Sequence, residues 1–184
     1  MSDAPEPVED LDKALRSAVR EIERHVAESG WDQPARLYAL VPTSDLVARE
    51  PRLAQAMGLD PSRGDGAGSL TPVEQDHVPA DQALEEVLAG IVWPAEVFGA
   101  AAVVERLVLP PSADAELPED AEAAERFAAE HPDRQEVRLV AAATRDGSTY
   151  CALRLREHDD AASVVEAPDL VPALLELVRG TLEN

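Results

Sequence analysis

The sequence predicts an α+β fold, with a single mixed or mainly antiparallel sheet of four to five strands and helices mostly on one face. Two alternating apolar segments surround Asp146-Gly147, which is typical of an antiparallel hairpin. Helical segments separate the other predicted strands, which indicates helices and strands in one layered domain. Because 184 residues suit one domain, we expect a disordered acidic tail at residues 1–7 and a single domain over residues 8–184.

The domain is expected to begin with a long helix. Apolar side chains recur with a helical period from Val8 to Ser29, and Gly30 supplies a stop. A strand is predicted at residues 35–41, where apolar residues precede a proline. Two short helices are then predicted at residues 43–48 and 51–57.

A Gly-rich loop is predicted at about residues 59–78, and its part at residues 69–74 is a candidate edge strand. After the loop comes a helix with four apolar side chains on one face: Leu84, Val87, Leu88 and Ile91. The apolar run at residues 100–109 predicts the central strand. An acidic helix at residues 118–130, the hairpin, and a terminal helix from Asp169 complete the expected order.

The register of the hairpin follows from the need to keep apolar side chains on one face. A three-residue loop, Arg145 to Gly147, places apolar residues opposite one another, whereas a two-residue loop mixes the faces. The core-facing pairs are Val137 with Leu155, Leu139 with Leu153 and Ala141 with Cys151. The outer pairs are Glu136 with Arg156, Arg138 with Arg154 and Ala142 with Tyr150.

The charge, the hydropathy and the cysteine content exclude several classes of partner and of covalent cross-link. The chain has 37 Asp and Glu against 16 Lys and Arg, a net charge of −21, which repels phosphate backbones, so we expect no nucleic-acid partner. No apolar run is long enough to cross a bilayer, so no membrane insertion is expected. The single cysteine, Cys151, excludes an internal disulfide and is expected in the core of a cytoplasmic protein.

Arginines nevertheless concentrate around the hairpin. Residues 134–156 carry a net charge of +3, whereas the rest of the chain carries −24. The register places Arg138, Arg154 and Arg156 on one face, which we call the arginine face. Two explanations stay open: an acidic helix of the chain, for instance residues 119–130, neutralises this face, or an acidic protein segment or small anion docks on it.

No motif points to catalysis, a cofactor or a metal. The four histidines lack metal-ligand spacing, and Gly-x-Ser-x-Gly is absent. The glycines at residues 64–68 resemble a phosphate loop but lack its Gly-Lys-Ser/Thr end. We therefore predict no catalytic residue, no cofactor and no metal.

Two blocks carry a family resemblance. Residues 91–111, which contain Trp93-Pro94, and residues 137–156 are similar to an uncharacterised actinobacterial family of small acidic cytoplasmic proteins. No activity is known for that family, so the resemblance implies a compartment and a lineage and no site residue.

We expect a non-catalytic cytoplasmic binding or accessory protein that uses the arginine face. Its candidate binding residues are Arg138, Arg154, Arg156, Tyr150 and Trp93. The alternative is a small enzyme, a hydrolase or transferase, with a site between the Gly-rich loop and the segment Trp93–Phe98. A pocket whose polar groups have perturbed pKa values would favour the enzyme, and a sheet face or apolar groove would favour binding. Ligand identity and oligomeric state are open.

Overall fold

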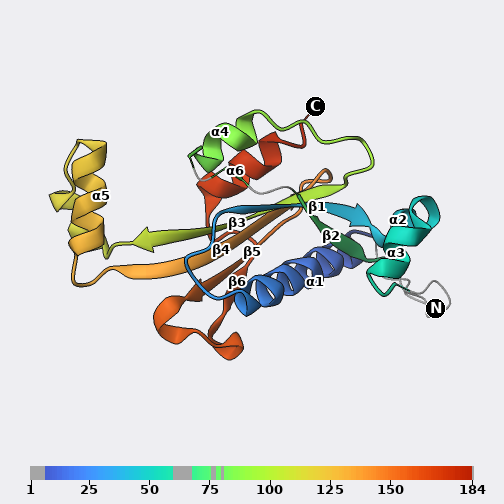
Figure 1. Ribbon diagram of the computed structural model, residues 1–184, viewed down its shortest axis with the longest axis horizontal. Coiled ribbons are helices and arrows are strands. Elements are labelled where there is room, and N and C mark those ends of the chain that lie inside the picture. The colour runs from blue at the N-terminus through green and yellow to red at the C-terminus, as the bar shows by residue number, and fades with distance from the viewer. Residues whose placement is uncertain (1–6, 60–67, 76–77, 80, 184) are drawn as a thin grey trace.

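The computed structural model describes residues 7–59, 68–75, 78–79 and 81–183, which form one open sheet with helices on both faces (Figure 1). The expected tail at residues 1–7, apart from Pro7, and residues 60–67 of the Gly-rich loop lie outside the described residues. The helices are α1 (Pro7–Glu28), α2 (Thr43–Arg49), α3 (Pro51–Ala56), α4 (Leu84–Ala89), α5 (Ala121–Glu130) and α6 (Pro172–Gly180). The strands are β1 (Arg36–Pro42), β2 (Leu70–Glu74), β3 (Gly99–Val108), β4 (Gln135–Thr144), β5 (Thr149–Leu155) and β6 (Val165–Ala167). Short 3₁₀ turns lie at Pro111–Glu116, Arg156–His158 and Ala161–Ser163.

The sheet has six strands in the order β2-β1-β3-β4-β5-β6, and every neighbouring pair is antiparallel. The α+β class is confirmed, but the prediction of four to five strands is wrong. The candidate edge strand forms as β2, and β6 adds a further edge beside β5. With three residues, β6 is too short for an alternating pattern to reveal it.

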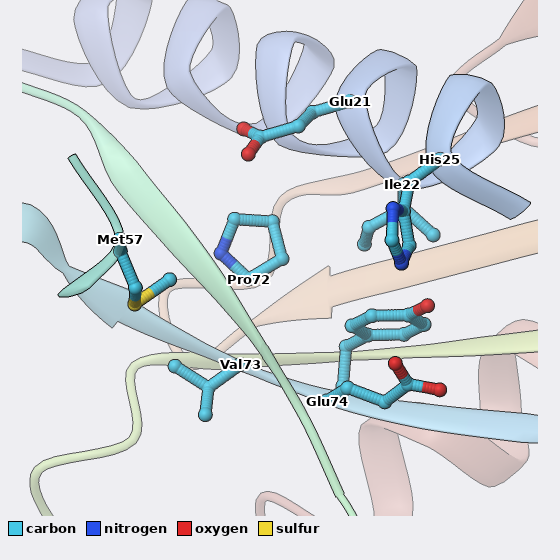
Figure 2. Close-up of a pocket in the computed structure, with 8 residues that line it drawn as sticks. Glu21, Ile22, His25, Met57, Pro72, Val73 and Glu74 are labelled. Carbon is cyan, nitrogen blue, oxygen red and sulfur yellow. The ribbon is translucent and has the colours of Figure 1, made fainter. Parts of the chain in front are cut away.

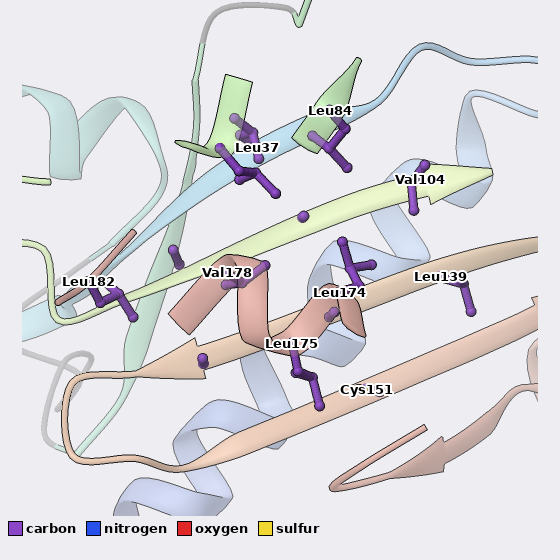
Figure 3. Close-up of a cluster of buried hydrophobic side chains, with 14 of the residues drawn as sticks. Leu37, Leu84, Val104, Leu139, Cys151, Leu174, Leu175, Val178 and Leu182 are labelled. Atoms are coloured by element: carbon purple, nitrogen blue, oxygen red, sulfur yellow. The ribbon is translucent and has the colours of Figure 1, made fainter. Parts of the chain in front are cut away.

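The prediction that helices lie mostly on one face is also wrong. α1 packs on one face of the sheet, whereas α4 and α6 pack on the other (Figure 1). Successive residues of β4 alternate between the two layers: Leu139 and Ala141 belong to the α6 side, and Val140 and Ala142 to the α1 side. Figure 3 shows the α6 side, where α6 lies over the central strands and Cys151 is fully buried.

The hairpin register is confirmed. Leu139 lies opposite Leu153 and Arg138 opposite Arg154, with Gly147 at a φ of 93° in the turn. At the start of β3, Gly99 is needed for close approach, because a Cβ there would lie 2.7 Å from the carbonyl oxygen of Ala143.

Two predicted helices begin later than expected. The acidic helix starts at Ala121, where the Asp120 side chain accepts a hydrogen bond from the Ala123 N–H at 3.0 Å. The terminal helix starts at Pro172 rather than Asp169, because proline suits the first turn of a helix.

Candidate functional site

The arginine face lies beneath α1, and α1 supplies the main counter-charge of Arg154. Arg154 forms a two-pronged contact with Glu23 of α1, through Nε to Oε1 and Nη2 to Oε2. Both side chains are 6% exposed, and Arg154 Nη1 also donates to Asp159 at 2.9 Å. The guanidinium lowers the pKa of Asp159. The neutralising helix is therefore α1 and not the helix at residues 119–130.

The segment after α1 covers the other two arginines. Arg138 is buried, stacks over the Trp31 ring at 4.4 Å, and donates to the Gly30 carbonyl and to Glu105. Arg156 lies 5.6 Å from the same ring, and its side chain is 39% exposed. It pairs with Asp32 at 2.9 Å, and this contact lowers the pKa of Asp32. Of the three arginines, Arg156 is the accessible one.

The other two candidate residues lie on opposite faces of the sheet. Tyr150 is buried on the α1 side, with the guanidinium of Arg16 5.6 Å from its ring. Trp93 is buried on the α6 side, where its indole N–H donates to Thr181 at 2.9 Å. Arg145 donates to the carbonyl oxygens of Trp93, Pro94 and Val97. These hydrogen bonds join residues 93–97 to the hairpin turn that contains Arg145. Tyr150 therefore shares a face with the arginines, and Trp93 does not.

A cavity of about 290 Å³ lies between α1 and the edge strand β2. Figure 2 shows Glu21, Ile22 and His25 reaching it from α1, facing Pro72, Val73 and Glu74 of β2, with Met57 at one end. Most of its lining surface is apolar, as in typical ligand sites.

Tyr38 of β1 also lines this cavity. The residue is 3% exposed, and its phenol oxygen has no hydrogen-bond partner among the described residues. Burial raises the pKa of the phenol, and the interaction with the Arg36 guanidinium opposes this shift. A buried hydroxyl without a partner costs about 1–3 kcal/mol, so such groups call for an explanation.

Carboxylates stand on both sides of the cavity. Desolvation raises the pKa of Glu21, and the positive charges of Arg24 and His25 oppose it only in part. Glu74, opposite Tyr38 in the β1–β2 register, pairs with Arg36 at 3.5 Å. The cavity thus combines an apolar wall, a buried phenol and two acidic groups.

Sequence reasoning missed Tyr38, Glu21 and Glu74. One signal was present: Glu21 and His25 are four residues apart, which places them on one face of the predicted helix. The opposite wall was not predictable, because it depends on how β2 pairs with β1 across the Gly-rich loop.

Over the described ranges, no three His, Cys, Asp or Glu side chains come together as a metal site. None of the described helices has the length and apolar character needed to cross a bilayer.

Comparison with known protein families finds a match that covers most of the chain. The family model described as "PPA1309-like protein" matches residues 15–183, which include α1, the whole sheet and α6. No curated protein and no solved structure matches the chain.

Proposed function

The chain belongs to the PPA1309-like protein family, and we propose that it is a non-catalytic binding protein that holds a small organic molecule in the cavity between α1 and β2. The supporting observation is the Tyr38 phenol, a buried polar group left without a partner at an apolar cavity. A ligand that exchanges a hydrogen bond with this oxygen would remove the cost of leaving it unsatisfied.

The location of the cavity adds support. Its walls belong to different elements, α1 and β2, which the sheet and the α1 packing hold at a fixed separation. Preformed clefts with apolar walls and a few convergent polar groups are the usual form of small-molecule sites. The cavity is near the lower end of the usual size range of about 300–1,000 Å³, which favours a small ligand.

The arginine face has a narrower proposed role. All three arginines already pair with acids of the chain, and Arg156 is the most exposed of them. An acidic protein segment or small anion would therefore have to compete with Asp32 and Glu136 for Arg156. We also propose the cytoplasmic location and the actinobacterial lineage that the sequence suggested.

The test is amide-resolved NMR of the full chain, titrated with small neutral, cationic and anionic aromatic molecules. We expect shifts that concentrate at Ile22, Tyr38 and Val73 with at least one class. In Tyr38→Phe the affinity of that class should fall, whereas the matched variant Tyr150→Phe, outside the cavity, should keep it. Shifts that avoid the cavity with all three classes would refute the proposal.

A small enzyme is the second candidate, and one observation favours it. Glu21 and Tyr38 both have raised pKa values at the same cavity, and perturbed groups cluster at catalytic sites. This location differs from the sequence-based alternative near Trp93–Phe98. Chemical conversion of a bound molecule in the same NMR samples, lost in Glu21→Gln, would favour the enzyme over the binding protein.

A further inference from the structure

A second apolar cavity lies on the other face of the sheet, between α4, α6 and the central strands. Its volume is about 350 Å³, and most of its lining surface is apolar. Val104 of β3 and Leu139 of β4 form the floor, and the first two turns of α6 form one wall. Figure 3 shows both strand residues beside Leu174 of α6, near the C-terminal end of β3. Among the described residues, this α6 cavity shares no lining residue with the α1–β2 cavity.

The wall from α6 is an apolar stripe that the fold leaves partly uncovered. Ala173 and Leu177 are four residues apart, so they lie on one side of the helix. Leu174 is buried against the sheet, but Ala173 is exposed and Leu177 is only partly buried. Val108 lies on the same side of β3 as Val104, is 43% exposed, and adds apolar surface farther along the strand. A partly uncovered helix stripe beside apolar strand residues is the kind of surface that receives a partner's amphipathic helix.

The surroundings of the α6 cavity are acidic. Arg106, the one basic residue among the described lining residues, already pairs with Glu85 of α4 at 2.9 Å. Further acids that are exposed and directly follow or precede lining residues in the sequence are Glu86, Asp169 and Glu176. The connection that follows β3, residues 109–134, adds eight Asp and Glu against two Arg. A cationic partner is therefore attracted to this end of the sheet, whereas a second copy of the chain, with its own charge of −21, is repelled.

We propose that the α6 cavity receives the apolar face of a basic amphipathic helix from a partner protein. Apolar side chains of that helix would enter the cavity and pack against Leu139 and Leu177, as anchor residues do at the centre of protein interfaces. Its Lys or Arg side chains would lie toward the surrounding acids. The apolar contacts would supply the affinity, and the opposite charges would speed association and exclude acidic partners. This site is separate from the small-molecule site between α1 and β2.

Three synthetic peptides of about 18 residues, long enough for five helical turns, test the partner class. The first contains Leu and Lys, with Leu in the amphipathic i, i+3, i+4, i+7 spacing. The second has the same composition in scrambled order, and the third has Glu in place of every Lys. Each is titrated into the full chain at about 0.15 M salt, which screens long-range attraction, with calorimetric and amide-resolved NMR readouts. We expect the amphipathic Leu/Lys peptide to bind at least about tenfold more tightly than either other peptide, with shifts at Leu139 and Leu177.

Two variants test the location. Ala173→Arg places a long side chain, of the same charge as the peptide, at the wall of the cavity. Because Ala173 is exposed, the variant should fold, and it should bind the amphipathic Leu/Lys peptide at least about tenfold more weakly. Ala162→Arg makes the same change in net charge at an exposed position that does not line the cavity, and it should keep the affinity. Thermal melting confirms that both variants are folded.

Each alternative outcome contradicts a different part of the proposal. Equal binding of the amphipathic and scrambled Leu/Lys peptides would overturn it by showing attraction to the net charge alone. Equal or tighter binding of the Leu/Glu peptide would overturn the basic character of the partner. Binding that survives Ala173→Arg, shifts that lie on another surface, or no binding of any peptide would overturn the site. None of these results depends on whether a small molecule binds between α1 and β2.

Discussion

Replacing Glu23 by leucine removes the main partner of a buried guanidinium. Both Glu23 and Arg154 are 6% exposed at their side chains, so water cannot readily replace the lost carboxylate. Removing one partner of a buried ion pair costs about 3–5 kcal/mol. Because Asp159 still accepts from Arg154 at 2.9 Å, we expect Glu23→Leu to lower the free energy of unfolding by about 3 kcal/mol, the lower end of that range.

The double variant Glu23→Leu/Arg154→Met tests the buried ion pair more stringently than Glu23→Leu alone. Replacing a buried pair by apolar residues of similar volume is often neutral or stabilising, because both desolvation penalties disappear. Asp159 then loses its partner, but its side chain is 46% exposed and water solvates it. We expect the double variant to lie within about 1 kcal/mol of the wild type.

Urea unfolding followed by tryptophan fluorescence measures these free energies by linear extrapolation. Arg20→Ala is the control, since it breaks a pair on the same helix in which the Arg20 side chain is 49% exposed. Exposed pairs contribute about 0–1 kcal/mol, so its loss should be small. The reasoning is refuted if Glu23→Leu costs no more than Arg20→Ala. It is also refuted if Glu23→Leu/Arg154→Met loses as much free energy of unfolding as Glu23→Leu alone.

Two further predictions concern the sheet. Cys151 is fully buried, and burial raises the pKa of its thiol. The native protein should therefore resist DTNB and react only on unfolding. Labelling of the native protein within seconds would contradict the core position of Cys151. Gly99→Ala should lower the free energy of unfolding by about 1–3 kcal/mol, because the added Cβ would lie 2.7 Å from the Ala143 carbonyl oxygen. An unchanged urea midpoint would contradict this prediction by showing that β3 and β4 can separate at Gly99.

The sequence predicts local pairing better than packing between distant elements. The hairpin register was predictable because only the three-residue loop from Arg145 to Gly147 places apolar residues of both strands opposite one another. Helices on both faces were not predicted, although consecutive apolar residues at 139–143 are typical of a strand that is buried on both sides.

The site was harder to predict than the sheet. An acidic helix opposite the arginine face was foreseen, but the rotation of α1 that brings Glu23 to Arg154 depends on tertiary packing. The pattern of β1 gives no sign that Tyr38 would be buried without a partner, because its environment comes from α1 and β2. These contacts join residues far apart in the chain, and no local propensity encodes them.

The free energy of unfolding of Tyr38→Phe, without ligand and relative to wild type, tests the central claim most directly. If the phenol oxygen awaits a ligand, its removal eliminates an unsatisfied buried group, and the variant should equal the wild type or exceed it by up to about 1 kcal/mol. A loss of more than about 1 kcal/mol, the usual contribution of a hydrogen bond that is made, would contradict the account by showing that the chain itself satisfies Tyr38.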